Sequence, residues 1–360
     1  MENQTSAPDK RIAILDLSLD EMETFLKPMG APSFRARQVF GWLYREMVVD
    51  FQRMTNVSKA LRDKLSETVV VQPLELVTES VSDDKLTRKA LFRLRDGALV
   101  EAVLMLYPRK EESKSRRTVC VSSQAGCGMG CAFCATGQGG LVRNLTSGEI
   151  AGQVIHFARE LAGAGETVTN VVVMGQGEPL ANFGQVLKAI ETLNSPYGFG
   201  LGARHFTIST VGLVPKIKEL ARTQLQVGLA VSLHAPSDEL RSRLMPVNER
   251  FSLRQLMAAC REYVAQTHRR VTFEYALING VNDSPGQARE LAALVKGILC
   301  HVNLIPLNVV SGSPFQPSSQ KRALAFQSEL VRHGIATTVR VKRGGHIDAA
   351  CGQLRARVQA

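Results

Sequence analysis

The chain has 360 residues, of which 44% are hydrophobic and 21% are charged, so it is long enough for a large domain and a smaller one. It contains no apolar run of about 18 residues, and its polar N-terminus lacks an apolar signal core, which excludes a membrane-spanning protein and predicts a cytoplasmic one. The net charge of +11 favours a polyanionic partner, because phosphate contacts release counterions.

Residues 1–75 show the periodicity of a small helical domain. Each of its three expected helices opens with a serine that can serve as N-cap: Ser18, Ser33 and Ser58. Glu21 stands three residues after Ser18, which is the spacing of a capping box. The helices are predicted at Leu19–Leu26, Ser33–Val48 and Ser58–Leu65.

This helical segment is rich in basic side chains. They form either an ordinary solvated surface or the face of an accessory domain that contacts RNA, and both interpretations stand at this point. The residues concerned are Arg35, Arg37, Arg45, Lys59, Arg62 and Lys64.

Residues 76–116 are expected to form a β-hairpin linker region. The apolar runs Leu91–Leu94 and Leu99–Leu106 are separated by Asp96–Gly97, a dipeptide typical of tight hairpin turns. Residues 108–117 are charged and lack periodicity, which predicts an exposed loop.

Residues 117–343 alternate between strand and helix, which predicts an α/β fold with a parallel sheet covered by helices. Six such units are too few for a closed eight-unit barrel, so we expect a partial (β/α)6 barrel, followed by a tail at 344–360. The strands are predicted at Val119–Ser122, Asn170–Met174, His205–Ser209, Gly228–Leu233, Val271–Leu277, Val302–Leu307 and Thr337–Val341, and the helices at Ser147–Leu161, Asn182–Asn194, Val214–Arg222, Ser252–Ala265, Ser284–Ile298 and Ser318–Arg332.

Three cysteines stand on a glycine-rich loop after the first barrel strand: Cys127, Cys131 and Cys134. Thiolates are soft ligands that suit iron–sulfur clusters or zinc. A structural zinc site takes four protein ligands, so three close thiols favour a [4Fe–4S] cluster with one iron open to a small molecule. A zinc site completed by Cys120 or a histidine is the alternative.

The CxxxCxxC spacing of this loop resembles the hallmark of the radical S-adenosylmethionine (SAM) superfamily. The resemblance implies a radical SAM partial barrel and a [4Fe–4S] cluster held by Cys127, Cys131 and Cys134, with SAM chelating the open iron. It also implies that electron transfer cleaves SAM to methionine and a 5′-deoxyadenosyl radical.

Polar groups recur where successive barrel strands end. Ligands of parallel α/β proteins bind at the carboxyl ends of the strands, and a carboxylate there could receive the ammonium of SAM. Any one of these positions alone is explained by a turn, whereas their recurrence favours a shared site. They are Gly177 and Glu178, Ser209, Ser232 with Leu233 and His234, and Asn308.

Several stretches narrow the resemblance to the RlmN/Cfr family, radical SAM methyltransferases that act on a specific adenine of 23S rRNA and, for RlmN, also on transfer RNA. The likeness covers most of the chain and implies SAM contacts at the seven strand-end residues. The stretches are Cys120-Val-Ser-Ser-Gln-Ala-Gly-Cys127, Met174-Gly-Gln-Gly-Glu-Pro-Leu180, Ser232-Leu-His-Ala-Pro236 and Ala349-Ala-Cys351-Gly-Gln-Leu354.

The same resemblance gives Cys351, Cys120 and Glu101 the roles in methyl transfer. An adenine C–H carbon is electrophilic, whereas a thiolate accepts a methyl group readily. Cys351 is expected to be methylated by one SAM, to lose a hydrogen atom to the radical from a second, and to join its methylene to the adenine carbon. Cys120 then attacks the Cys351 sulfur, which releases the base and leaves a transient disulfide. Glu101 matches the family's proton acceptor.

The chain departs from the family pattern in a few places. His346 stands where the family usually has Asp, which changes the local hydrogen bonding expected around Cys351, and Gln176 stands where Met is common. The segment Arg109–Arg117 is longer than usual. None of these departures removes a group with a direct chemical role.

The expected partners are 23S rRNA and a reductant such as flavodoxin or ferredoxin, with no membrane association. With few aromatic side chains, RNA recognition should depend on shape and charge. The basic residues placed to hold phosphates are Arg116, Arg117, Arg340, Lys342 and Arg343.

The regiochemistry stays open between C2 of adenine, favoured by the closer match to RlmN, and C8, as in Cfr. Whether transfer RNA is also a substrate stays open too. Other readings are a radical SAM enzyme acting on a protein or small molecule, or an iron–sulfur RNA-binding protein that never cleaves SAM. Neither accounts for the pair Cys120 and Cys351.

Overall fold

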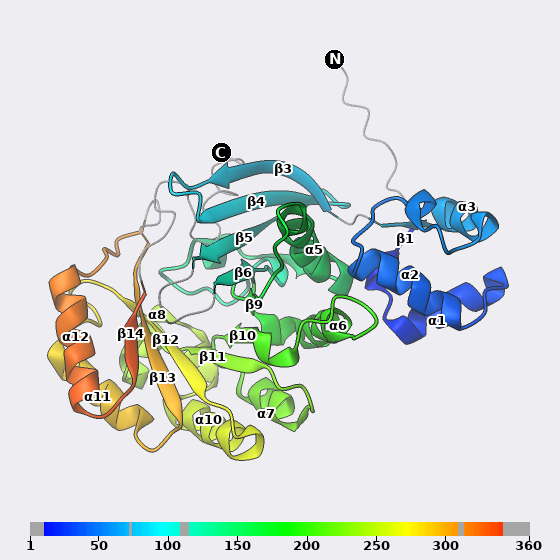
Figure 1. Cartoon of the computed structure of the whole chain (residues 1–360). Helices are drawn as coiled ribbons and strands as arrows, with labels where there is room; N and C mark the ends of the chain where they lie inside the picture. The colour runs from blue at the N-terminus through cyan, green and yellow to red at the C-terminus, as the bar shows by residue number, and fades with distance from the viewer. Residues whose placement is uncertain (1–10, 72–73, 109–114, 309–312, 341–360) are drawn as a thin grey trace.

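The computed structural model describes residues 11–71, 74–108, 115–308 and 313–340. Its centre is a ten-stranded sheet with the strand order β14-β13-β12-β11-β10-β9-β6-β5-β4-β3. The strands from β6 to β14 in this order run parallel, and helices cover their outer side (Figure 1). This is the α/β partial barrel that the sequence predicts.

Six strand–helix units build the barrel, and β14 closes the row, as predicted. The predicted bounds of β12 and α7 are reproduced, and the other units shift by a few residues at their ends. The strands are β6 (Arg116–Cys120), β9 (Asn170–Val173), β10 (Phe206–Thr210), β11 (Gly228–Ser232), β12 (Val271–Leu277), β13 (Cys300–Pro306) and β14 (Thr337–Val339), and the helices are α5 (Ser147–Gly163), α6 (Phe183–Asn194), α7 (Val214–Arg222), α10 (Leu253–Thr267), α11 (Pro285–Val295) and α12 (Gln320–Arg332).

Smaller elements that the sequence analysis did not predict lie between these units. Three of them lie around the cysteine loop, and two follow β11 before α10. They are β7 (Gln124–Gly126), α4 (Ala135–Gln138), β8 (Leu141–Asn144), α8 (Asp238–Leu244) and α9 (Val247–Arg250). Strands β7 and β8 pair antiparallel and so close the cysteine loop at its base.

The expected hairpin is present but belongs to a larger unit. Strand β4 (Thr87–Leu94) pairs antiparallel with β5 (Leu99–Tyr107), and the additional strand β3 (Leu74–Val81) pairs with β4. Gly97 adopts φ +86° in the turn, a conformation that suits glycine. Strand β5 also pairs antiparallel with β6, so the hairpin extends the barrel sheet without a break.

The N-terminal helices are α1 (Leu19–Leu26), α2 (Phe34–Tyr44) and α3 (Lys59–Thr68). The capping box of Ser18 and Glu21 is formed, and Ser58 caps α3 through the N–H of Leu61. Ser33 occupies the N-cap position of α2 as predicted, but its backbone is helical, with φ −50° and ψ −37°, and its side chain makes no capping hydrogen bond.

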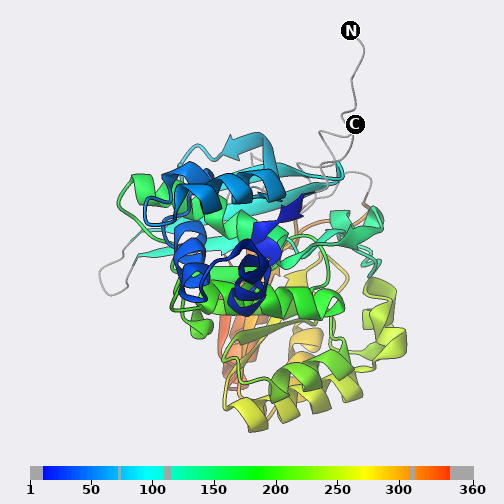
Figure 2. The same ribbon diagram turned by 90° about the vertical axis from the view of Figure 1, so that its right-hand side faces the viewer.

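These helices pack against the helical layer of the barrel. Gly148 at the start of α5 donates its N–H to Asp16 at 2.8 Å, and Lys188 of α6 pairs with Glu21. Figure 2 views the molecule from the right-hand side of Figure 1 and shows the helical segment in front of the barrel. The short strands β1 (Ile12–Ala13) and β2 (Val69–Val70) pair and join the two ends of the segment.

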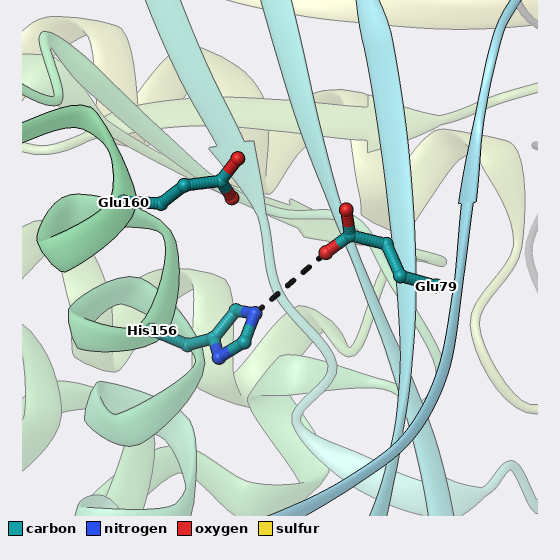
Figure 3. A group of neighbouring side chains, drawn as sticks. All are labelled: Glu79, His156 and Glu160. Atoms are coloured by element: carbon teal, nitrogen blue, oxygen red, sulfur yellow. Dashed lines mark ion pairs between the residues drawn. The ribbon is translucent and has the colours of Figure 1, made fainter. Parts of the chain in front are cut away.

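A polar cluster fastens the sheet extension to α5. Glu79 of β3 points toward His156 and Glu160 of α5, with the His156 Nε2 atom 3.8 Å from a Glu79 oxygen (Figure 3). The Arg88 guanidinium of β4 pairs with both carboxylates, so a cation already lies among them. Burial lowers the pKa of His156 and favours its neutral form. We interpret the cluster as a junction between layers.

In the part of the chain that the structure describes, no helix is long and apolar enough to cross a membrane.

Candidate active site

The three cysteines of the motif lie together on the loop between β7 and α4. Cys127 and Cys131 are buried and Cys134 is half-buried, and all three line one cavity of about 150 Å³. The Cys127 N–H donates to Gly140 O at 2.8 Å, which folds the loop back on itself. At Gly126, which has φ +80°, a Cβ atom would collide with that same carbonyl oxygen. The loop therefore needs glycine at position 126 to bring the thiols together.

The electrostatics of the loop suit a bound cation. Burial raises the pKa of Cys127 to about 11 and that of Cys131 to about 12. Both thiols therefore keep their protons at neutral pH until a metal centre replaces them. Three soft sulfur donors around one cavity fit an iron–sulfur cluster.

The carboxyl ends of the strands form the remaining wall of this cavity. Five of the seven predicted SAM-contact residues line it: Gly177, Glu178, Ser209, Ser232 and His234. The sequence analysis missed other lining residues, among them Phe133, Met174, Thr210 and Met245. Met174 is the last residue of one predicted strand, and Thr210 directly follows another. The choice of residues at strand ends could therefore have included both.

The other two predicted contacts lie elsewhere. Leu233 is fully buried, packs into the main core and donates its N–H to Glu274 O at 3.0 Å. Asn308 is exposed and does not line the cavity. The structure thus brings five of the seven residues together around the cysteines.

Glu178 is a buried carboxyl group held by backbone donors. Leu180 N–H donates to one oxygen at 3.0 Å and Val211 N–H donates to the other at 2.8 Å. Its own N–H donates to Gln124 Oε1 at 2.8 Å. Burial raises the pKa of Glu178 to about 7 despite these bonds, so a cationic ligand would stabilise the ionised form.

His234 is fixed in a left-handed backbone conformation, with φ +58°. Its Nδ1 atom accepts the N–H of Ala276 at 2.9 Å, and its carbonyl oxygen accepts from Asn282 at 2.8 Å. Burial, aided by the charge of Arg241, lowers the pKa of His234 to about 3. The ring is therefore neutral, and its other nitrogen carries the proton.

Cys120 and Glu101 lie on the sheet beside this cavity. Cys120 of β6 is the register partner of Val103 of β5 and packs with Met174, which lines the cavity. Glu101 shares the face of β5 with Val103, because side chains two residues apart point the same way. Cys351, the tail 344–360 and His346 lie outside the described residues.

Glu101 has a partner that the sequence analysis missed. The Lys89 ammonium of β4 lies 2.9 Å from its carboxylate, and the side chains are 0% and 3% exposed. The two strands are antiparallel and pair Lys89 with Val103, which places Lys89 diagonally across from Glu101. The position of Lys89 next to the apolar run of its strand was the one sequence feature that could have indicated a buried lysine with an acidic partner.

The predicted RNA-contacting arginines have different surroundings. Arg117 donates to Thr167 O and pairs with Glu166, so its guanidinium is engaged within the chain. Arg116 stacks over the Tyr107 ring at 4.3 Å. Arg340 donates to the sulfur of Met105 at 3.6 Å and so lies close to the Cys120 face. Lys342, Arg343 and residues 109–114 lie outside the described residues.

Comparison with known proteins places the chain in a family. Residues 12–71 match the ribosomal RNA large subunit methyltransferase N-terminal domain, and residues 121–292 match the radical SAM superfamily. The chain is 50% identical over 355 residues to a probable dual-specificity RNA methyltransferase RlmN of Chloroflexus aurantiacus, covering 96% of this chain and 93% of that protein. It is 51% identical to a protein of the same name from Symbiobacterium thermophilum, covering 95% and 91%.

A solved structure agrees with these relatives. The crystal structure of a radical SAM methyltransferase from Sphaerobacter thermophilus superposes with a TM-score of 0.91 and 51% identity, covering 95% of this chain and 98% of that one. With a cysteine loop, a strand-end cavity and full-length relatives in agreement, the chain belongs to the RlmN family of radical SAM enzymes.

Proposed function

We propose that this protein is a SAM-dependent RNA methyltransferase that methylates C2 of a specific adenine in 23S rRNA, with transfer RNA as a second substrate. The observation that carries the proposal is the cavity shared by Cys127, Cys131, Cys134 and Glu178, with Cys120 on the adjoining sheet face. Radical SAM enzymes use a [4Fe–4S] cluster and SAM, and the three thiols and the buried carboxylate fit this pair.

The cysteine loop and the strand ends divide the binding between them. Cys127, Cys131 and Cys134 would hold the cluster, and the bound cluster would supply the electron that cleaves SAM. Glu178 receives the SAM ammonium, because an ion pair removes the unfavourable burial of its carboxylate. The other proposed contacts are Gly177, Ser209, Ser232, Leu233, His234 and Asn308. The side chain of Leu233 is buried in the core.

Cys351 carries the methyl group and Cys120 releases the product. The Cys351 thiolate takes a methyl group from one SAM, which leaves as S-adenosylhomocysteine. The 5′-deoxyadenosyl radical of a second SAM would then take a hydrogen atom from this S-methyl group, and the methylene radical would add to the adenine carbon. The adduct radical would pass one electron back to the redox centre that supplied it and so become a closed-shell thioether-linked adduct. Glu101 accepts the proton from the adenine carbon, and the Cys120 thiolate attacks the Cys351 sulfur. The carbon–sulfur bond then breaks, its electron pair stays with the methylene carbon, which takes up one proton to become the methyl group of the base, and a Cys120–Cys351 disulfide remains.

The other parts of the chain serve RNA binding and electron supply. The helical segment 1–75 and the basic residues near the site hold the RNA backbone. The disulfide and the cluster both need reduction, for which a flavodoxin or ferredoxin is the expected donor. An enzyme that modifies ribosomal RNA acts where ribosomes are made, so we place it in the cytoplasm.

The test is to incubate the reconstituted holoprotein anaerobically with 23S rRNA fragments and with transfer RNA, and to identify the methyladenosine isomer by mass spectrometry. We expect 2-methyladenosine. C120A should accumulate a protein–RNA adduct that survives denaturing electrophoresis, whereas C351A should form neither adduct nor product. An 8-methyl product would contradict the C2 assignment, and product formation by C351A would contradict the relay.

A further inference from the structure

Arg241 is the largest fully buried side chain that the active-site assignment leaves unexplained. It lies on α8, whose exposed residues are Asp238, Glu239 and Arg243, and its own exposure is 0%. A fully buried arginine is rare without a charged partner, because the interior penalises an unpaired charge.

The direct partners of Arg241 are all uncharged oxygens at the cavity edge. The Nε atom donates to Leu233 O at 3.2 Å, and Nη2 donates to Val211 O at 2.6 Å and to Ser232 O at 3.2 Å. The Nη1 atom donates to Asn248 Oδ1 at 3.0 Å. These bonds satisfy the donors and fix the ends of β10 and β11, but they do not neutralise the guanidinium.

Arg241 lies directly behind the wall of the cavity that the cysteines line, because Val211 and Ser232, whose carbonyl oxygens it binds, line that cavity together with Cys131. Burial lowers the pKa of Arg241 to about 10, and the neighbour that most opposes this shift is Cys131, ahead of Asp238. Contacts support this proximity: Ala132 donates its N–H to Leu244 O at 3.0 Å, and Cys131 packs with Leu244 and Met245. Arg241 thus stays charged at neutral pH beside the sulfur donors.

We propose that Arg241 is a positioning residue that supplies the countercharge of the iron–sulfur site. This inference rests on the proposed function. Three thiolates around a [4Fe–4S] core give a net negative centre, which becomes more negative on reduction. A buried guanidinium beside it favours assembly and makes the reduction potential less negative. The guanidinium of Arg241 also donates hydrogen bonds to the carbonyl oxygens of Val211, Ser232 and Leu233. The N–H of Val211 in turn donates to Glu178.

The test separates the charge from the hydrogen bonds with two variants. R241Q keeps amide donors and removes the charge, whereas R241K keeps the charge and removes the fork. R243Q, which changes an exposed arginine on the same helix, is the matched control. Each holoprotein is reconstituted anaerobically and assayed for iron and sulfide, for midpoint potential by EPR-monitored titration, and for SAM affinity by equilibrium dialysis.

We expect R241K to keep the wild-type potential while binding SAM several-fold more weakly. R241Q should either have a more negative potential or fail to hold the cluster that R241K holds. A wild-type potential in a fully loaded R241Q would overturn the proposal. So would loss of the cluster in both variants, since that result assigns Arg241 a purely structural role. None of these readouts requires RNA methylation, and a wild-type protein without iron would instead refute the proposed function.

Discussion

Glu178, the proposed partner of the SAM ammonium, is deeply buried, and this should make SAM binding dependent on pH. Burial raises its pKa to about 7, so the carboxyl group is protonated below that pH and ionised above it. The SAM ammonium pairs only with the ionised form. SAM affinity of the holoprotein should therefore rise between about pH 6 and about pH 8.

Equilibrium dialysis of holoprotein at several pH values measures this dependence. E178Q should bind SAM about 10-fold to 100-fold more weakly at high pH, the equivalent of one charged hydrogen bond, and should lose the dependence. His234 is neutral over this whole range, because its pKa is about 3, and so contributes no dependence of its own. An unchanged pH profile in E178Q would show that another group controls binding.

The buried pair of Lys89 and Glu101 should be costly to break. K89M removes the ammonium group that faces a buried carboxylate, so it should destabilise the protein by about 3–5 kcal/mol. The exposed pair of Arg93 and Glu75, with side chains 48% and 66% exposed, joins β4 to β3 and is the natural control. R93M should cost less than about 1 kcal/mol. Urea unfolding of the two variants compares them, and equal losses would argue against burial as the cause.

At the scale of elements, two glycines of positive φ should respond differently to alanine. Gly97 in the β4–β5 turn has nothing within 4 Å of the position of a Cβ, so G97A should cost only the conformational strain of about 1–2 kcal/mol. In G126A the added Cβ would also collide with the Gly140 carbonyl that closes the cysteine loop.

G126A should therefore lose cluster binding, while G97A keeps it. Iron and sulfide content after anaerobic reconstitution measures the difference, and circular dichroism checks that both variants fold. A full cluster in G126A would mean that the loop tolerates opening at its base.

Elements with regular periodicity were predictable from sequence, and elements defined by tertiary pairing were not. The strand β3 lies at the sheet edge and is mostly half-buried or exposed, so it lacks clear alternation. Strands β7 and β8 are short and lie around the glycine-rich loop. The charged sequence of helix α8 predicts a surface helix. The burial of Arg241 could not be predicted, because its hydrogen-bond acceptors come from other elements, at the ends of β10 and β11.

Five of the seven residues chosen by the strand-end rule line the cavity, whereas Leu233 and Asn308 do not. Ser232 ends β11 and His234 follows it in a left-handed conformation, and both line the cavity, while the side chain of Leu233 between them packs in the core. The resemblance named all three residues together. Lys89 and Arg241 could not be paired with their partners from sequence, since their contacts join strands and helices that are distant in the chain.

At the scale of the whole molecule, one sheet contains both the hairpin region and the barrel, which the sequence pattern assigns to separate segments. The pattern changes from hairpin to alternating units near residue 117, and this change marked a boundary between segments. The structure places β5 and β6 in register over five residue pairs, from Val103 with Cys120 to Tyr107 with Arg116. Strand β6 pairs antiparallel with β5 and parallel with β9, so the hydrogen bonds of the sheet continue across the predicted boundary. The change in sequence pattern near residue 117 therefore does not mark a boundary in the sheet.

This shared ladder has a consequence for how the target nucleotide meets the enzyme. Glu101 and Cys120 belong to adjoining strands of one sheet, with neighbours paired on both sides, so neither can swing out toward a base within an RNA helix. In the proposed mechanism, the adenine must instead leave its stack to reach Glu101 and Cys120. The free energy for that unstacking has to come from the contacts between the enzyme and the surrounding RNA. Unstacking of the base, and not motion of the sheet, should therefore limit access to the site.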